Sequence, residues 1–179
     1  SGERIFIGSG SSAPQGIVEA IGENPGMFND SEVTHISTLG PTPYTEPRFK
    51  NHLRHNALFI GSNTRQSVLR GDSDYTPVFL SEIPTLFRKK RIKIDIALIQ
   101  VSPGSQSGMY SLGANVDVIR GAMEHARLVI AQVNRDAPYT FGQGELCRSE
   151  MDYLWDSDNM LPEHLDGELG LVELAIGRN

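Results

Sequence analysis

Short apolar runs with the character of β-strands recur along the chain, and turn residues or segments of helical periodicity separate them. The first three runs cover residues 4–7, 33–36 and 57–60. The last two, residues 94–101 and 128–133, contain consecutive apolar positions, as a parallel strand buried on both faces requires. The pattern therefore predicts five strands of a buried sheet.

Helical segments are predicted between these strands. Pro14 stands at a first helical position after candidate capping serines, and apolar residues follow it at helical spacing over residues 17–21. Further helices are predicted over residues 67–69, 81–91 and 116–125. The alternation of strands and helices predicts an α/β fold with an open, mostly parallel sheet flanked by helices.

The composition fits one globular domain over residues 1–179. With 39% hydrophobic residues, a chain of 179 residues builds a core that needs no disulfide or metal. The single Cys147 points to a reducing compartment and thus to the cytoplasm. A net charge of −6 opposes phosphate backbones and anionic lipid, so neither nucleic acid nor a membrane surface is an expected partner.

The two ends of the chain do not have the pattern of domain edges. No initiator Met is present, and no signal peptide or membrane span is recognisable in the sequence. Residues 171–176 are amphipathic and stop in mid-pattern. We expect a fragment of a longer protein, with an apolar face that a further domain or a second copy covers.

The loops that follow the predicted strands are the expected place for a ligand, because open α/β sheets bind ligands outside the carboxyl ends of their strands. These loops are rich in Gly, Ser, Thr, Asn and Pro and poor in charge. They cover residues 8–14, 37–44, 61–65, 102–113 and 134–144. Such loops offer hydroxyl and backbone N–H donors to a ligand but no evident catalytic group.

Several familiar chemistries do not match the sequence. The segment GSGSSA at residues 8–13 has the form of a dinucleotide-binding turn, but the second strand ends in ISTL without the acidic residue that holds a ribose. No phosphate-binding loop of the P-loop type is present, and Gln106 stands where a nucleophile elbow needs serine. His52 and His55 lack zinc-protease spacing and are expected to be a surface or hydrogen-bonded pair. Cys147 is expected to be an inert thiol, and no metal site is predicted.

The only basic run, residues 88–91, ends the helix predicted over residues 81–91. Cations suit the carboxyl end of a helix dipole, and four residues without interleaved aromatics are a weak signal for phosphate. We therefore favour a solvated helix end over a phosphate site.

Five segments in this order resemble the amino-terminal domain of the acetyl-CoA hydrolase/transferase family, which includes 4-hydroxybutyrate and succinyl-CoA:acetate CoA-transferases. They are RIFIGSGSSAP at residues 4–14, FIGSNTR at 59–65 with Gly71, DYTPVFLSEIP at 74–84, DIALIQVSPGSQSGMYSLG at 95–113 and VIAQVNRDAPYTFG at 129–142. The resemblance covers most of the chain.

The resemblance implies a two-domain enzyme of the CoA-transferase fold, with the substrate between related α/β halves and coenzyme A as substrate rather than cofactor. In this family a glutamate attacks an acyl-CoA thioester, becomes a glutamyl-CoA thioester, and passes CoA to a short carboxylic acid. That glutamate lies in the carboxyl-terminal domain. No catalytic residue is therefore predicted in this chain, which alone should be inactive; Glu82 is expected to cap a helix start, and Glu145 to be a polar loop residue.

The matching loops imply one wall of the acyl and carboxylate pocket. Neutral donors suit a carboxylate substrate, because they bind it without a buried cation that holds the product too tightly. The candidate binding residues are Ser9, Gly10, Ser62, Asn63, Ser102, Tyr110, Ser111, Gly113 and Asn134. The alternative, open above all for the glycines, is that these residues only satisfy turn geometry.

Departures from the family pattern leave the acceptor acid open. A second proline and an aspartate are expected where the chain has Gly104 and Ser105, and a methionine is common where it has Ala137. Hydrolysis of the acyl-CoA by water remains an alternative to transfer. A sugar-phosphate isomerase would need a basic phosphate clamp that these loops lack, and a non-catalytic acyl-CoA-binding module or a homo-oligomer also fits the pattern.

Overall fold

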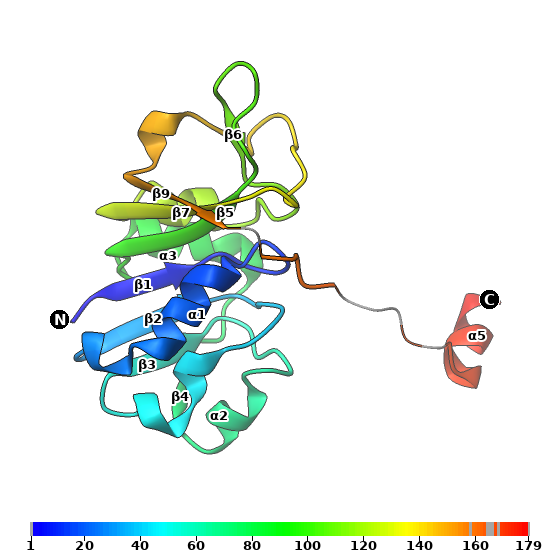
Figure 1. Ribbon diagram of the computed structural model, residues 1–179. Coiled ribbons are helices and arrows are strands. Elements are labelled where there is room, and N and C mark those ends of the chain that lie inside the picture. Colours follow the sequence, from blue (N-terminus) through cyan, green and yellow to red (C-terminus); the bar gives the residue numbers. More distant parts are fainter. Residues whose placement is uncertain (1, 158, 164–166, 168, 179) are drawn as a thin grey trace.

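The structure is a computed structural model that describes residues 2–157, 159–163, 167 and 169–178. Its core is one seven-stranded parallel sheet (Figure 1). The strand order is β4-β3-β2-β1-β5-β7-β9. The strands are β1 (Arg4–Ile7), β2 (Ser31–His35), β3 (Leu53–Ala57), β4 (Ser73–Tyr75), β5 (Ile96–Val101), β7 (Leu128–Asn134) and β9 (Tyr153–Ser157). A separate antiparallel pair joins β6 (Tyr110–Ser111) to β8 (Glu145–Leu146). The predicted α/β fold is thus confirmed.

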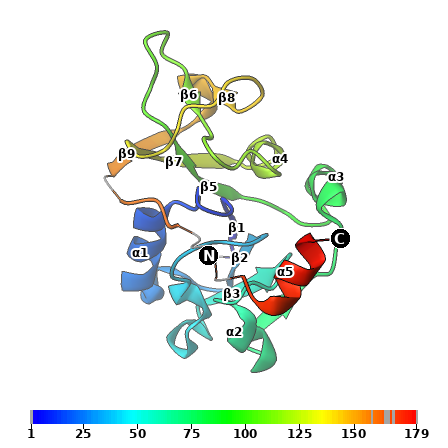
Figure 2. The ribbon, with the colours of Figure 1, turned by 90° about the vertical axis from the view of Figure 1, so that its right-hand side faces the viewer.

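Helices cover both faces of the sheet (Figures 1 and 2). On one face α1 (Gln15–Glu23) packs over β1 and β2 with Tyr44 and Phe49 from the short turns η2 (Pro43–Thr45) and η3 (Pro47–Phe49). On the other face lie α3 (Ile83–Arg88) and α4 (Ile119–Met123). The rings of Phe6 and Phe87 meet edge to face with centroids 5.8 Å apart. Each face therefore has its own apolar core, as a doubly wound sheet requires.

The remaining helical elements are short. Helix α2 (Arg65–Leu69) follows β3, and 3₁₀ turns lie at η1 (Pro25–Met27), η4 (Leu80–Glu82) and η5 (Arg148–Glu150). Helix α5 (Leu171–Gly177) stands away from the sheet in Figure 1, with exposed Leu171, Val172 and Ile176. The expected apolar face at residues 171–176 is therefore present. None of the described helices is long and apolar enough to cross a membrane.

The prediction for the third strand was wrong in position. Residues 57–60 were predicted, but the ladder with β2 pairs Ser31 with Leu53 and His35 with Ala57. Phe59 lies beyond the strand and is 56% exposed. The apolar run therefore marks the residues that leave the sheet, whereas the strand itself contains polar side chains that the core accommodates.

Three further expectations on local structure need correction. Strands β4 and β9 at the two sheet edges were not predicted, because each carries mostly exposed side chains. Helix α1 begins at Gln15, with Pro14 at the N-cap position and no side-chain cap. Helix α3 begins at Ile83 after a 3₁₀ turn, and Glu82 makes no capping hydrogen bond although it occupies the N-cap position.

Candidate functional site

The loop after β1 lies at the point where the strand order reverses, between β1 and β5, which is the ligand position in open α/β sheets. Gly10 has φ +59°, and its N–H donates to the Ser37 carbonyl at 2.6 Å. A Cβ on Gly10 would come within 2.6–2.9 Å of the Asn115 side-chain amide. Two independent constraints, a left-handed backbone and close approach of an amide, thus select glycine at this position.

Ser102, Ser111 and Gly113 form one hydrogen-bonded unit at the end of β5. The Ser111 N–H donates to Ser102 Oγ at 3.1 Å, and the Gly113 N–H donates to Ser111 Oγ at 3.1 Å. Ser111 Oγ also donates to the Thr140 carbonyl at 2.8 Å and accepts from the Thr140 N–H at 3.0 Å. These serines shape the loop, and the half-buried ring of Tyr110 lies beside them, next to Gly104.

A layer of buried amides continues this edge of the sheet. Asn134 ends β7, and its Nδ2 donates to Gln100 Oε1 at 3.0 Å while its Oδ1 accepts from the Asp136 N–H at 2.9 Å. Ser9 and Gln100 each lie two residues beyond the paired Ile7 and Leu98, Ser9 in the loop after β1 and Gln100 within β5. Among the described residues Ser9 Oγ and Gln100 Nε2 are buried without a hydrogen-bond partner. Buried polar atoms of this kind are candidates for contact with a ligand.

Ser62 and Asn63 follow β3 and differ in their surroundings. Asn63 Nδ2 donates to the carbonyls of Thr38 at 3.0 Å and Gly40 at 3.1 Å, so its amide joins two loops of the carboxyl edge. Ser62 is exposed. Its hydroxyl is thus open to a ligand, whereas the Asn63 amide already has protein partners.

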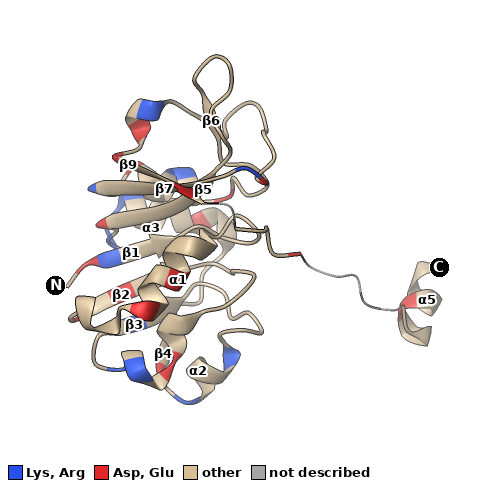
Figure 3. Ribbon diagram, viewed as in Figure 1, with Lys and Arg blue, Asp and Glu red and all other residues tan. Residues whose placement is uncertain are grey.

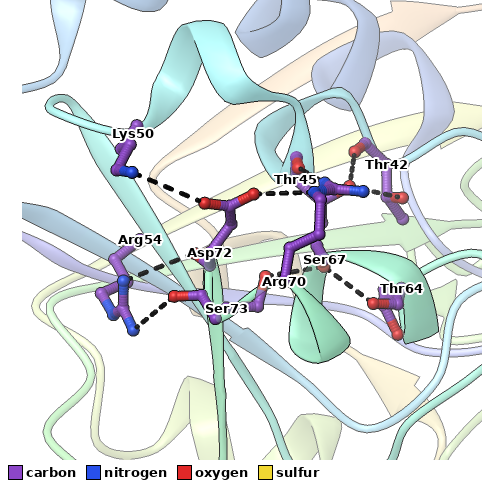
Figure 4. A network of polar contacts seen from close by, with 10 residues as sticks. Thr42, Thr45, Lys50, Arg54, Thr64, Ser67, Arg70, Asp72 and Ser73 are labelled. Atoms are coloured by element: carbon purple, nitrogen blue, oxygen red, sulfur yellow. Dashed lines mark hydrogen bonds and ion pairs between the residues drawn. The ribbon is translucent and has the colours of Figure 1, made fainter.

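A polar network that includes Thr42, Thr45, Arg70 and Asp72 lies next to the loop that carries Ser62; Figure 4 shows these four residues. Thr42 Oγ1 donates to the Asn63 carbonyl at 3.3 Å, and Arg70 Nη2 donates to the Thr45 carbonyl at 3.4 Å. Arg70 is held in turn by Asp72, with 2.8 Å between Nε and Oδ2. The loop after β3 is therefore anchored to η2 and to the start of β4.

Replacing Asn63 with alanine is expected to lower the free energy of unfolding by about 1–2 kcal/mol, because two loop carbonyls lose their donor. Urea denaturation measures the change. Ser62→Ala is the matched control and should shift the free energy by less than about 0.5 kcal/mol, since its side chain is exposed. Equal effects of the two substitutions would contradict the bridging role of Asn63.

The glutamates near these loops have structural partners. Glu145 Oε1 accepts from the Tyr139 hydroxyl at 2.6 Å and Oε2 from the Gly142 N–H at 3.0 Å, and these hydrogen bonds lower the pKa of Glu145. Glu150 pairs with Arg120 at 2.9 Å and accepts from the Cys147 N–H at 2.7 Å. A lowered pKa and engaged oxygens make Glu145 a poor nucleophile toward a thioester. Glu145 was expected in a loop, but it begins the short strand β8.

An apolar hollow follows β4 at the same edge. It has a volume of about 330 Å³ and is lined by Tyr75, Pro77, Val78, Phe79 and Glu82. Phe79 is 78% exposed. None of these residues was predicted to bind a ligand, although exposed aromatic side chains beside a polar loop are a signal for a binding surface.

His55 corrects the prediction of a surface or hydrogen-bonded histidine pair. His55 is buried, and neither ring nitrogen has a hydrogen-bond partner among the described residues. Its ring stacks on buried His35 with centroids 4.5 Å apart, and Tyr44 Oη lies 2.9 Å from His35 Nε2. Burial lowers the pKa of His55 from 6.5 to about 4. His52 is half-buried, and its Nδ1 lies 3.1 Å from the Phe28 carbonyl. The described residues contain no group of three or more His, Cys, Asp and Glu side chains that could hold a metal ion.

The contacts of Gly10, Gln100 and Thr140 in this site were not predicted. Gln100 had a usable signal, because it is a lone amide within the otherwise apolar strand β5. The approach of Asn115 to Gly10 depends on tertiary structure and leaves no local pattern in the sequence.

Cys147 is a free, exposed thiol.

Comparison with known proteins identifies relatives along the whole chain. The chain is 39% identical over 176 residues to a 4-hydroxybutyrate coenzyme A transferase of Clostridium kluyveri, covering 98% of this chain and 41% of that protein. It is 40% identical over 147 residues to a succinyl-CoA:acetate/propanoyl-CoA:succinate CoA transferase of Fasciola hepatica, covering 81% and 30%. The chain thus spans less than half the length of these relatives.

A solved structure shares the fold. The crystal structure of RipA from Yersinia pestis superposes with a TM-score of 0.87 at 23% identity, covering 96% of this chain and 42% of that one. Residues 1–162 match the acetyl-CoA hydrolase/transferase N-terminal domain. The chain therefore belongs to the acetyl-CoA hydrolase/transferase family and carries its N-terminal domain.

Proposed function

We propose that this chain is the amino-terminal half of a CoA-transferase that moves CoA from an acyl-CoA to a short carboxylic acid such as acetate or 4-hydroxybutyrate. The observation that carries the proposal is the 39% identity to a 4-hydroxybutyrate coenzyme A transferase over 98% of the chain. The site adds chemical support, because neutral donors gather at the switch point of the sheet while Glu145 and Glu150 are engaged elsewhere.

The proposed reaction needs a carboxylate nucleophile from outside this chain. That glutamate attacks the thioester carbonyl, the CoA thiolate leaves, and an acyl-glutamyl anhydride forms. The thiolate then attacks the glutamyl carbonyl and releases the first acid. The acceptor carboxylate attacks the resulting glutamyl-CoA thioester to form an anhydride, from which the thiolate takes the new acyl group.

The role of this chain in that sequence is to bind and orient. Ser62 offers an exposed hydroxyl to the acid, and Tyr110 lies half-buried at the mouth of the loop after β5. Phe79 and Tyr75 supply apolar surface to an acyl group or to the arm of CoA. Coenzyme A is the substrate, and the reaction requires no resident cofactor.

The organisation of the protein follows from the same proposal. Residues 1–179 form one domain, and a carboxyl-terminal catalytic domain closes the site and covers the apolar side of α5. The lone Cys147 is consistent with a cytoplasmic protein. A homo-oligomer is compatible with the exposed apolar side chains.

Ser62→Ala is expected to lower CoA transfer by about tenfold in the polypeptide that carries both domains, which is the usual effect of losing one hydrogen bond to a charged group. Its thermal stability should stay unchanged. Ser149→Ala, an exposed serine in η5, is the matched control and should leave transfer unchanged. Full activity of Ser62→Ala would remove Ser62 from the site.

The function itself is tested by CoA exchange from acetyl-CoA to a panel of short carboxylates. The assay compares this chain with the same chain continued into whatever its gene encodes after Asn179. Transfer by the longer polypeptide alone supports the proposal, and the preferred acid identifies the acceptor. Thioester hydrolysis without transfer would indicate an acyl-CoA hydrolase of the same family, and inactivity of both would indicate a binding module.

A further inference from the structure

A basic hollow lies at the amino edge of the sheet, opposite the loops described above. It has a volume of about 240 Å³, and its cations come from two separate segments, Lys90 and Lys93 before β5 and Arg127 before β7. Its floor is apolar and includes Phe87 and Ile94, and the carboxylate of Asp95 also lines it. Figure 3 shows Lys and Arg positions at the amino ends of β1 and β7, on this side of the sheet.

The charge of this hollow runs against that of the chain. The net charge is −6, yet three of the four lysines lie within residues 89–93. Lys93 pairs with Asp95, with 2.7 Å between Nζ and Oδ1. In the part of the chain that the structure describes, Lys90 and Arg127 have no ion pair with a carboxylate. Burial raises the pKa of Asp95, but Lys93, the Arg4 N–H and, at longer range, Arg127 lower it. Lys90 is thus the lining cation that has no carboxylate partner in the described part of the chain.

Lys90 also occupies a backbone position that favours glycine. Helix α3 ends in a turn in which the Lys90 N–H donates to the Phe87 carbonyl at 2.9 Å and the Arg91 N–H to the Leu86 carbonyl at 2.9 Å. Lys90 lies there at φ +53°, the left-handed conformation that glycine adopts without steric cost. A lysine at position 90 is not needed to balance the helix dipole, because Arg88 and Lys89 already place positive charge at the carboxyl end of α3.

We propose that this hollow binds a phosphate group. Lys90 and Arg127 supply charge and hydrogen-bond donors to the phosphate oxygens, Lys93 strengthens the local positive potential, and the apolar floor accommodates part of an attached organic group. The sequence run at residues 88–91 gave only a weak phosphate signal. The structure adds a second segment with Arg127, which lines the same open hollow, and this favours a phosphate site. The inference is independent of the proposed transferase function.

The test is an NMR titration of the chain with inorganic phosphate, with sodium chloride at matched ionic strength as the reference salt. Phosphate should shift the backbone amides of residues 87–95 and 125–127 saturably, and chloride should not. Lys90→Gly and Arg127→Gln should each weaken the affinity by about fivefold or more. Lys89→Gln removes a neighbouring charge that does not line the hollow and should weaken it by about twofold or less.

Lys90→Gly separates binding from folding. Glycine relieves the left-handed backbone, so the variant should melt about 2–4 °C higher while it binds phosphate more weakly. A loss of affinity therefore does not reflect damage to the fold. Equal weakening by Lys89→Gln and Lys90→Gly, or equal shifts by chloride and phosphate, would overturn the proposal in favour of an unspecific charged surface.

Phosphate reaches such a site either as a free anion or as part of a larger molecule such as CoA. Competition distinguishes the two sources. Displacement of phosphate by CoA, but not by pantetheine, assigns the site to the nucleotide phosphates of CoA. Phosphate shifts that persist in the presence of CoA assign it to a separate phosphate-bearing ligand.

Discussion

Acidification from pH 7 to pH 5 is expected to lower the free energy of unfolding by about 4 kcal/mol through His35 and His55. The two rings, of His35 at the end of β2 and His55 in the middle of β3, stack on each other, and both are buried. Burial lowers the pKa of His35 well below 6.5, and the facing His55 lowers it further. Burial likewise lowers the pKa of His55 to about 4.

The folded and unfolded states differ in how many protons the two histidines bind, and this difference sets the direction of the pH dependence. In the unfolded chain both histidines take up a proton near pH 6.5, whereas in the folded chain they stay neutral to much lower pH. The unfolded state therefore binds more protons below pH 6.5, and stability falls by about 1.4 kcal/mol per pH unit for each histidine. Well above pH 6.5, where neither state binds the proton, this contribution is constant.

Urea denaturation between pH 5 and pH 7.5 measures the slope. His55→Phe keeps a ring at the stacking position and should remove about half of the pH dependence. His52→Gln, at a half-buried histidine near the amino edge, is the matched control and should leave the slope unchanged. A wild-type slope equal to that of His55→Phe would contradict the burial of two neutral histidines.

Ser111→Ala is expected to cost about 3 kcal/mol of stability and to displace the loop after β5. The Ser111 hydroxyl donates to the Thr140 carbonyl and accepts from the N–H groups of Gly113 and Thr140. Ser111 is fully buried, so water does not replace these three partners without rearrangement. A single hydroxyl is used to its full hydrogen-bonding capacity here.

Thermal unfolding and hydrogen exchange of the Gly113 and Thr140 amides measure this change. Both amides should exchange faster in Ser111→Ala than in the wild-type chain. Ser107→Ala removes an exposed hydroxyl from the same loop and should alter neither quantity. Unchanged exchange at both amides in Ser111→Ala would show that the loop does not depend on this serine.

The central strands were predictable because burial on both faces leaves a continuous apolar run. Strands β5 and β7 show this pattern and lie next to each other near the middle of the sheet. Strand β3 escaped prediction because Arg54 is exposed and His55 is a polar residue accepted into the core. Strand propensity therefore did not locate β3, because tertiary contacts decide whether its side chains are buried.

The candidate site was predictable in its place but not in its contacts. The order of strands puts the loops after β1, β3 and β5 at one edge, as the alternation of elements implies. Whether a polar side chain faces a ligand or another loop depends on distant residues. Asn63 turns to Thr38 and Gly40, whereas exposed Ser62 beside it does not.

The most direct test of the central claim is peptide mapping by mass spectrometry after incubation with acetyl-CoA. The claim is that the nucleophile lies outside residues 1–179. We expect no CoA thioester on this chain, and one on a single glutamate beyond Asn179 in the polypeptide continued through its gene. A CoA thioester on Glu82, Glu145 or Glu150 would contradict the account.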